Sequence, residues 1–247
     1  MDDTPRPLVE HLEELRRRLF WILGTMGVAL PLAIAFQEEI FKFMSLPAVS
    51  ILLEQGRKLQ ALQPAEIFFT YLKTAILASF VVSLPMTLYQ AWAFVAPGLY
   101  SNERRLALPF VISTTVLFLL GDAFGHQVAF PVMFRYFVSL ESDLITNQWT
   151  ASEVFGFMAR MYLAFGISFQ LPVIMVFLTT AGVVTPEQLA NSRKYAIVVM
   201  FVIGAILTPP DVVSQIMLSV PLVVLYESGI LASRILRRRR LARESLA

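Results

Sequence analysis

The sequence contains no cysteine and only two histidines among its 247 residues. A disulfide and a thiolate metal site are therefore excluded, and little is left for imidazole acid–base chemistry. Charged residues are also scarce, at 15% of the chain against about a quarter in soluble domains. Phosphate-binding P-loop, GxSxG and HExxH motifs are all missing, so the sequence predicts no enzyme, no metal and no cofactor.

Apolar residues are abundant instead, making up 57% of the chain and falling in long blocks. Because a helix rises about 1.5 Å per residue, about 20 apolar residues cross a hydrocarbon core about 30 Å thick. Six blocks reach or approach that length, and the last two are short: 20–36, 68–94, 106–137, 154–184, 195–207 and 216–226. The sequence therefore predicts an all-α polytopic membrane protein, with a single six-helix domain over residues 1–247.

Basic residues are distributed unevenly between the ends of these blocks. One set of flanks carries fourteen of them, whereas the opposite flanks carry only Lys42, Arg57 and Lys58. Because loops rich in Lys and Arg stay in the cytoplasm, we expect both termini there, with a basic tail from about residue 234. The net charge of +2 gives no reason to expect nucleic-acid binding, since the basic residues lie at the edges of apolar blocks.

Two glutamates stand among the basic residues of these cytoplasmic flanks. Glu14 lies in the stretch HLEELRRRL, and Glu103 lies in SNERR. Locally, Glu14 can pair with Arg18 at i,i+4. Glu103 can cap the third apolar helix or pair with Arg104 or Arg105. Alternatively, both acids belong to an acidic patch at the membrane rim that binds a cationic ligand.

Several polar side chains lie within the apolar blocks, and those that most need a partner are Asp122, His126, Arg160 and Gln170. Asp122 and His126 are spaced i,i+4 on the third block, at a depth where an ionisable group needs a partner. They can pair with each other, bond to Arg160 of the next helix or form a proton-responsive site. A secondary transporter or ion channel using these three residues is therefore an alternative function.

Prolines and caps predict where helices begin and break. Pro47 is expected to break an amphipathic stretch over residues 38–55. Thr185, followed by Pro186, has the chemistry of a helix start. Gln170 precedes Pro172, which removes a backbone hydrogen bond and predicts a break in the fourth apolar helix.

Five segments, taken in order, resemble the TatC family, the signal-peptide receptor subunit of the twin-arginine protein translocase. They are HLEELRRRL, YQAWAFVAPGLYSNERR, FGISFQLPV, LTPPDVVSQ and PLVVLYE. The resemblance implies a concave, glove-like bundle of six helices in the bacterial cytoplasmic (inner) membrane. It also implies recognition of the twin-arginine signal peptides of folded proteins, whose export is driven by the proton-motive force.

The resemblance assigns candidate site residues as well. Glu14 and Glu103 match family glutamates implicated in binding the arginine pair, since a carboxylate accepts a two-bond fork from a guanidinium. Neighbouring arginines would hold these carboxylates in place, and other family positions match without a specified role. These supporting candidates are Arg16, Pro47, Phe94, Tyr100, Arg105, Asp211 and Gln215.

The partners implied by the resemblance are TatB- and TatA-like single-span subunits, the lipid bilayer and further copies of the chain in a receptor complex. The chain departs from the family pattern at Gln170, where many members have glutamate. Glutamine cannot titrate, so a role that needs charge is in doubt there, whereas hydrogen bonding to a partner helix remains available.

Overall fold

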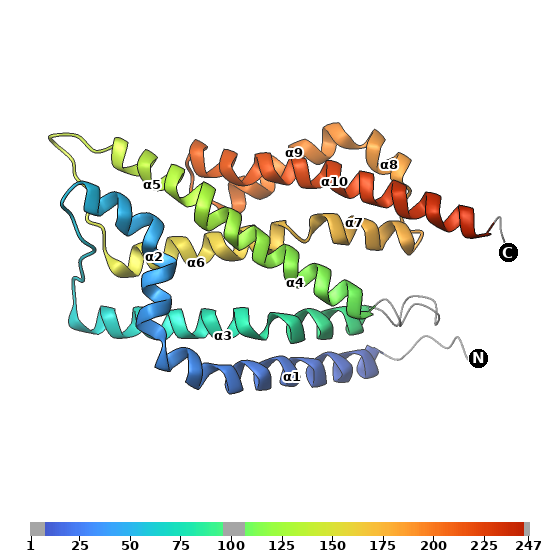
Figure 1. Ribbon diagram of the computed structural model, residues 1–247, viewed down its shortest axis with the longest axis horizontal. Helices are drawn as coiled ribbons and strands as arrows, with labels where there is room; N and C mark the ends of the chain where they lie inside the picture. The colour runs from blue at the N-terminus through green and yellow to red at the C-terminus, as the bar shows by residue number, and fades with distance from the viewer. Residues whose placement is uncertain (1–7, 96–106, 245–247) are drawn as a thin grey trace. The chain divides into compact units, whose positions relative to one another are not determined.

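The computed structural model describes residues 8–95 and 107–244, which are helical over most of their length (Figure 1). Glu103, Tyr100 and Arg105 lie outside the described residues. The helical elements, in chain order, are α1 (Leu8–Ala35), α2 (Gln37–Glu54), α3 (Pro64–Val95), α4 (Ala107–Phe124), η3 (Gly125–Ala129), α5 (Phe130–Ser139), α6 (Ala151–Ser168), α7 (Leu171–Thr180), α8 (Pro186–Asn191), α9 (Arg193–Leu207) and α10 (Val212–Glu244).

Five helical stretches are long and apolar enough to cross a membrane, which confirms a multi-pass membrane protein. They are Leu12–Ala35, Pro64–Phe94, Leu108–Ser139, Ala151–Thr180 and Val212–Arg238. The remaining predicted span, 195–207, corresponds to α9, whose 15 residues give a helix about 22 Å long. A sixth crossing therefore stays a prediction.

The last helix is much longer than the short segment 216–226 that was predicted. α10 has 33 residues and continues through the basic stretch after Tyr226. Hydropathy located only the apolar part of this helix. Arginine, leucine and glutamate are strong helix formers, so the polar extension stays helical where it is no longer apolar.

Backbone contacts divide the chain into two compact units. The first unit takes its described residues from Met1–Lys42 and Phe68–Thr115, and the second takes them from Phe43–Ile67 and Val116–Ala247. In the first unit, α1 and α3 run side by side (Figure 1), and Trp92 of α3 stacks on Phe110 of α4 with ring centroids 4.1 Å apart. The prediction of a single domain stays a prediction.

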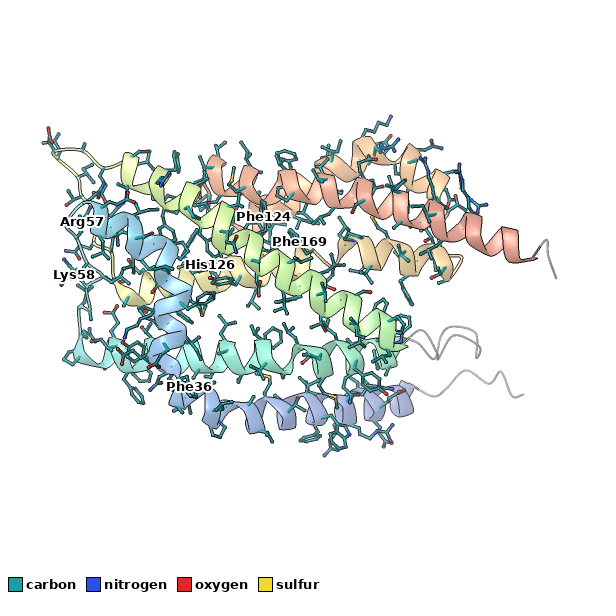
Figure 2. The ribbon with its side chains drawn as sticks, viewed as in Figure 1. Phe36, Arg57, Lys58, Phe124, His126 and Phe169 are labelled. Carbon is teal, nitrogen blue, oxygen red and sulfur yellow. The ribbon has the colours of Figure 1, made fainter. Side chains whose placement is uncertain are left out.

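In the second unit, glycines allow α4 and α6 to pack closely. A Cβ atom at Gly121 would lie 2.6 Å from the carbonyl oxygen of Phe165, so only glycine fits there without a shift. Phe124 lies near Phe169 (Figure 2), with ring centroids 5.9 Å apart. The ring centroids of Phe124 and Phe165 are 5.7 Å apart. Aromatic rings therefore fill the space around this close backbone approach.

A π-helical turn, η3, interrupts the helix that continues from α4 into α5. The N–H of Phe130 donates to the carbonyl of Gly125, a bond that spans five residues and not four. Pro131 follows at once and has no N–H, and its ring would collide with the carbonyl of Gln127 in a regular helix. The wider turn accommodates this proline without ending the helix.

Pro172 breaks the fourth apolar helix as predicted. α6 ends at Ser168 and α7 begins at Leu171. The amide nitrogen of the Gln170 side chain donates to the carbonyl of Gly166 at 3.3 Å, which supplies that carbonyl with a partner at the break. The break therefore lies against protein groups, as the bilayer requires.

Pro47 does not break its helix, so that prediction was wrong. α2 runs without interruption from Gln37 to Glu54, and Pro47 is buried within it. Burial of neighbouring side chains such as Ala48 and Leu52 holds the helix together across the missing N–H. The start at Thr185 is confirmed, because its hydroxyl accepts from the N–H of Gln188 and its own N–H donates to that side chain.

Candidate functional site

Glu14 lies on the face of α1 that packs against α3. Both Nε and Nη2 of Arg18 bond to Oε1 of Glu14, at 3.1 and 2.5 Å. Only 14% of the Glu14 side chain and 16% of the Arg18 side chain are exposed. The i,i+4 pair predicted from the sequence is therefore confirmed, and because it is partly buried, salt screens it less than a solvent-exposed pair.

Arg18 also fastens this pair to the neighbouring helix. Its Nη1 donates to Oε1 of Gln90 at 3.1 Å, and its Nη2 donates to the carbonyl of Ala93 at 2.8 Å. A guanidinium carries five N–H donors in a rigid fork, so one arginine can hold a carboxylate and an adjacent helix together. The position of the Glu14 carboxylate is thus set by both α1 and the end of α3.

Sequence reasoning missed this role of Arg18. The i,i+4 rule identifies neighbours on one helix, but it says nothing of side chains on another helix. Gln90 was the available signal, because it is a polar residue near the end of an apolar block, where a side-chain partner is expected.

Of the supporting candidates, two lie near this pair in the first unit. The guanidinium of Arg16 lies 5.6 Å from the centre of the Phe20 ring. Phe94 lies one turn after Gln90 on α3 and is partly exposed. Tyr100, Glu103 and Arg105 lie outside the described residues, so the approach of Glu103 to Glu14 stays a prediction.

Asp211 and Gln215 organise the start of α10. Oδ1 of Asp211 accepts from the N–H of Ser214 at 2.7 Å, which makes Asp211 the N-cap of the helix. Nε2 of Gln215 donates to the carbonyl of Phe201 in α9 at 3.1 Å. Both candidates therefore fix the hairpin between the last two helices.

His126 pairs with a tyrosine that the sequence analysis did not name. Its Nδ1 lies 2.6 Å from the hydroxyl of Tyr162 on α6, and its ring stacks on that of Phe43 with ring centroids 4.7 Å apart. The Tyr162 hydroxyl also lies 3.4 Å from the carbonyl of Met44. The sequence carries little indication of this bond, because the ring of a tyrosine fits an apolar helix whether or not its hydroxyl has a partner on another helix.

Asp122 and Arg160 take no part in that contact. Nε of Arg160 donates to the carbonyl of Gly156 on its own helix, on an exposed face. Among the residues that the structure describes, neither Asp122 nor Arg160 is hydrogen-bonded to His126, and Oδ1 of Asp122 is buried without a partner. Nδ1 of His126 is engaged by the Tyr162 hydroxyl instead.

The chain was compared with known proteins. Its residues 10–221 match a family described as Sec-independent protein translocase protein (TatC). Proteins of that name from Desulforapulum autotrophicum and Escherichia coli K12 are both 38% identical to the chain. These alignments cover 97% and 95% of the chain, and 88% and 90% of the relatives.

A solved structure of a twin-arginine translocase receptor, TatC, has a similar fold. It is 35% identical in sequence and superimposes with a TM-score of 0.76, covering 91% of this chain and 98% of its own. The family likeness therefore extends over nearly the whole chain, in sequence and in backbone alike.

Proposed function

This chain belongs to the TatC family of Sec-independent protein translocase proteins, and from that premise we propose how its candidate site works. The chain is a subunit of the twin-arginine translocase and acts with other components of that system. It recognises the twin-arginine signal peptides of folded proteins and initiates their export. The proton-motive force drives that export, and the subunit itself has no enzymatic activity.

The geometry of Glu14 is the observation that carries this proposal. Its carboxylate is held by Arg18, which is itself anchored to Gln90 and Ala93 of α3. An ionised carboxylate held in place in this way presents a fixed negative charge to a guanidinium of the signal peptide.

Glu103 supplies the second carboxylate in this proposal. It follows α3 in the chain, ten residues after the Ala93 carbonyl to which Arg18 bonds. Two adjacent arginines on a peptide then meet two acids, each able to take a bidentate fork. Arg16, Phe94, Tyr100 and Arg105 are supporting candidates in this proposal, with no individual role assigned.

The topology in this proposal is that of six helices in a glove-like arrangement, with α9 as the sixth crossing. Both termini lie in the cytoplasm, and the protein resides in the bacterial inner membrane. Gln170, at the helix break, offers a hydrogen-bonding contact to TatA- and TatB-like single-span subunits. Several copies of the chain assemble in one receptor complex, and Pro47, Asp211 and Gln215 support its outer end.

Titration of a twin-arginine peptide against the full chain in detergent tests the proposed site. We expect Glu14→Gln and Glu103→Gln each to weaken binding about tenfold, because a charge-assisted hydrogen bond contributes about 1.5–3 kcal/mol. Glu54→Gln, at an exposed acid elsewhere, is the matched control. A double variant, Glu14→Gln with Glu103→Gln, that binds as tightly as the unchanged protein would contradict the assignment.

The alternative of a transporter or ion channel requires a relay through Asp122, His126 and Arg160. Arg160 bonds within its own helix on an exposed face, whereas His126 bonds to Tyr162. No observation on the described residues favours that relay. Flux of a solute through liposomes containing this chain alone would support it.

A further inference from the structure

The exposed face of α1 carries a groove of about 640 Å³, which shares only the supporting candidate Arg16 with the proposed peptide site. It is lined by Glu13, Arg16, Arg17, Phe20, Trp21 and Gly24. These positions recur every three or four residues, so they form one stripe along the helix. Glu14 and Arg18 lie on the inner face, because Arg18 bonds to α3. The groove is therefore a separate site, and it does not rest on the proposed function.

The stripe divides into a charged end and an apolar end. Glu13, Arg16 and Arg17 precede the apolar block, which starts at about Phe20. In a bilayer the charged end lies at the level of the headgroups, and Trp21 lies at the boundary that tryptophan favours. A ligand that fits both ends must itself have a polar head and an apolar tail.

The charges of the groove have a specific complement. Two arginines suit a phosphate, because guanidinium forks match its oxygens, while Glu13 suits a cation with N–H donors. Residues three and four apart on a helix have Cβ atoms about 5–6 Å apart, so the acid and the arginines can meet groups joined by a short bridge. We propose that the groove binds a phospholipid whose headgroup carries a phosphodiester and a primary ammonium, as in phosphatidylethanolamine.

The apolar end has room for an acyl chain. A Cβ atom added at Gly24 would meet no atom within 4 Å, and Trp21 is 59% exposed beside it. Val28, one turn further along, is 82% exposed and continues the same apolar face. The Phe20 ring holds the Arg16 guanidinium 5.6 Å from its centre, which keeps that charge at the mouth of the groove.

Glu13 distinguishes this headgroup from other common ones. Phosphatidylglycerol ends in a neutral glycerol, whose hydroxyls can donate to Glu13 but bring no positive charge to its carboxylate. Phosphatidylcholine has a quaternary ammonium, which has no N–H to donate. The groove should therefore prefer the ethanolamine lipid to both.

Native mass spectrometry of the full chain in detergent tests the proposal, with the three lipids titrated at matched acyl chains. We expect the ethanolamine lipid to bind about fivefold more tightly than the choline lipid, the effect of about one hydrogen bond. Glu13→Gln should abolish this preference, and Arg17→Gln should weaken binding of all three lipids. Gly24→Leu should exclude the lipids by filling the groove, and it also favours the helix, so the variant should fold.

Glu39→Gln and Arg135→Gln, at exposed positions on α2 and α5, are the matched charge controls and should change nothing. Equal binding of all three lipids, unaffected by Glu13→Gln, would overturn the proposal. So would displacement of the lipid by an equal concentration of water-soluble glycerophosphoethanolamine, because the acyl chain would then contribute nothing. A dimer of the chain that Gly24→Leu disperses would assign the groove to a second copy instead. If Glu13→Gln binds the twin-arginine peptide as tightly as the unchanged protein, the lipid groove and the peptide site are independent of each other.

Discussion

Arg57 and Glu141 are 84 positions apart in the chain, and their side chains form an ion pair of 2.5 Å in the second unit. The same carboxylate accepts from Nε1 of Trp149 at 2.9 Å, and Nη2 of Arg57 donates to the carbonyl of Asn147 at 2.6 Å. These bonds join the connection after α2 to the connection after α5. A single carboxylate therefore fastens two long loops together.

The Glu141 contacts predict a dependence of stability on acid. Partial burial alone would raise the pKa of this carboxyl, but bonds from Trp149 and Arg57 outweigh it and hold the pKa below 4.5. Stabilisation by ionised Glu141 is therefore present above pH 4.5 and is lost as the pH falls through the lowered value. As the pH is lowered below 4.5, the melting temperature of Glu141→Gln in detergent should fall less than that of the unchanged protein. Parallel acid profiles of the two proteins would contradict this.

Arg18→Lys tests whether the guanidinium fork positions Glu14. Lysine keeps the charge but donates from a single nitrogen, so it lacks the planar fork whose three nitrogens reach the carboxylate, Gln90 and the Ala93 carbonyl. We expect peptide binding to weaken about threefold to tenfold while the chain still folds, as measured by the same peptide titration. Arg17→Lys, on the exposed face of the same helix, is the control. An Arg18→Lys protein with unaltered affinity would show that Glu14 needs no such support.

Alanine substitutions at two glycines should have opposite effects on stability. Alanine at Gly121 would bring its Cβ within 2.6 Å of the Phe165 carbonyl oxygen, so we expect a loss of about 1–3 kcal/mol of stability. Alanine at Gly156 meets no atom within 4 Å, and better helix propensity should leave stability unchanged or raise it by up to about 1 kcal/mol. Thermal unfolding in detergent compares the two. Equal melting temperatures would refute the close packing of α4 and α6.

His126 and Tyr162 should be coupled in a double-mutant cycle. Hydrogen bonds between helices in a membrane contribute about 0.6 kcal/mol on average and up to about 1.7 kcal/mol. We expect His126→Phe and Tyr162→Phe to show a coupling energy in that range, with the double variant less destabilised than the sum. Unfolding of the four proteins in one detergent measures it. Strictly additive effects would mean that the 2.6 Å contact does not stabilise the fold.

Composition and block length predicted the helical class and the approximate location of five spans, because the bilayer fixes how many apolar residues a crossing needs. The helix break at Pro172 was predicted correctly, because a proline removes a backbone hydrogen bond and nearby Gln170 marks a polar point within an apolar helix. Pro47 was not, because burial of its neighbours decides whether a helix continues, and burial is invisible in one sequence. The extension of α10 was missed because hydropathy locates apolar segments and does not detect a helix made of polar residues.

The candidate site was predictable only in part. Glu14 and its partner Arg18 follow from local spacing, and both belong to one helix. The bonds from Arg18 to Gln90 and from His126 to Tyr162 join segments far apart in the chain, at 72 and 36 positions. Such bonds depend on how helices are packed and rotated, which residue periodicity does not specify.

The π turn at Gly125–Ala129 sets the rotational phase of the helix that contains it. It holds one residue more than a regular turn, so α5 is rotated relative to an unbroken continuation of α4. If all the residues of this turn wound as a regular α-helix, the buried Met133 and Phe134 would swing about 100° around the axis. Those side chains would then exchange a protein neighbour for lipid. The length of this span is therefore constrained by angular register as well as by the thickness of the bilayer.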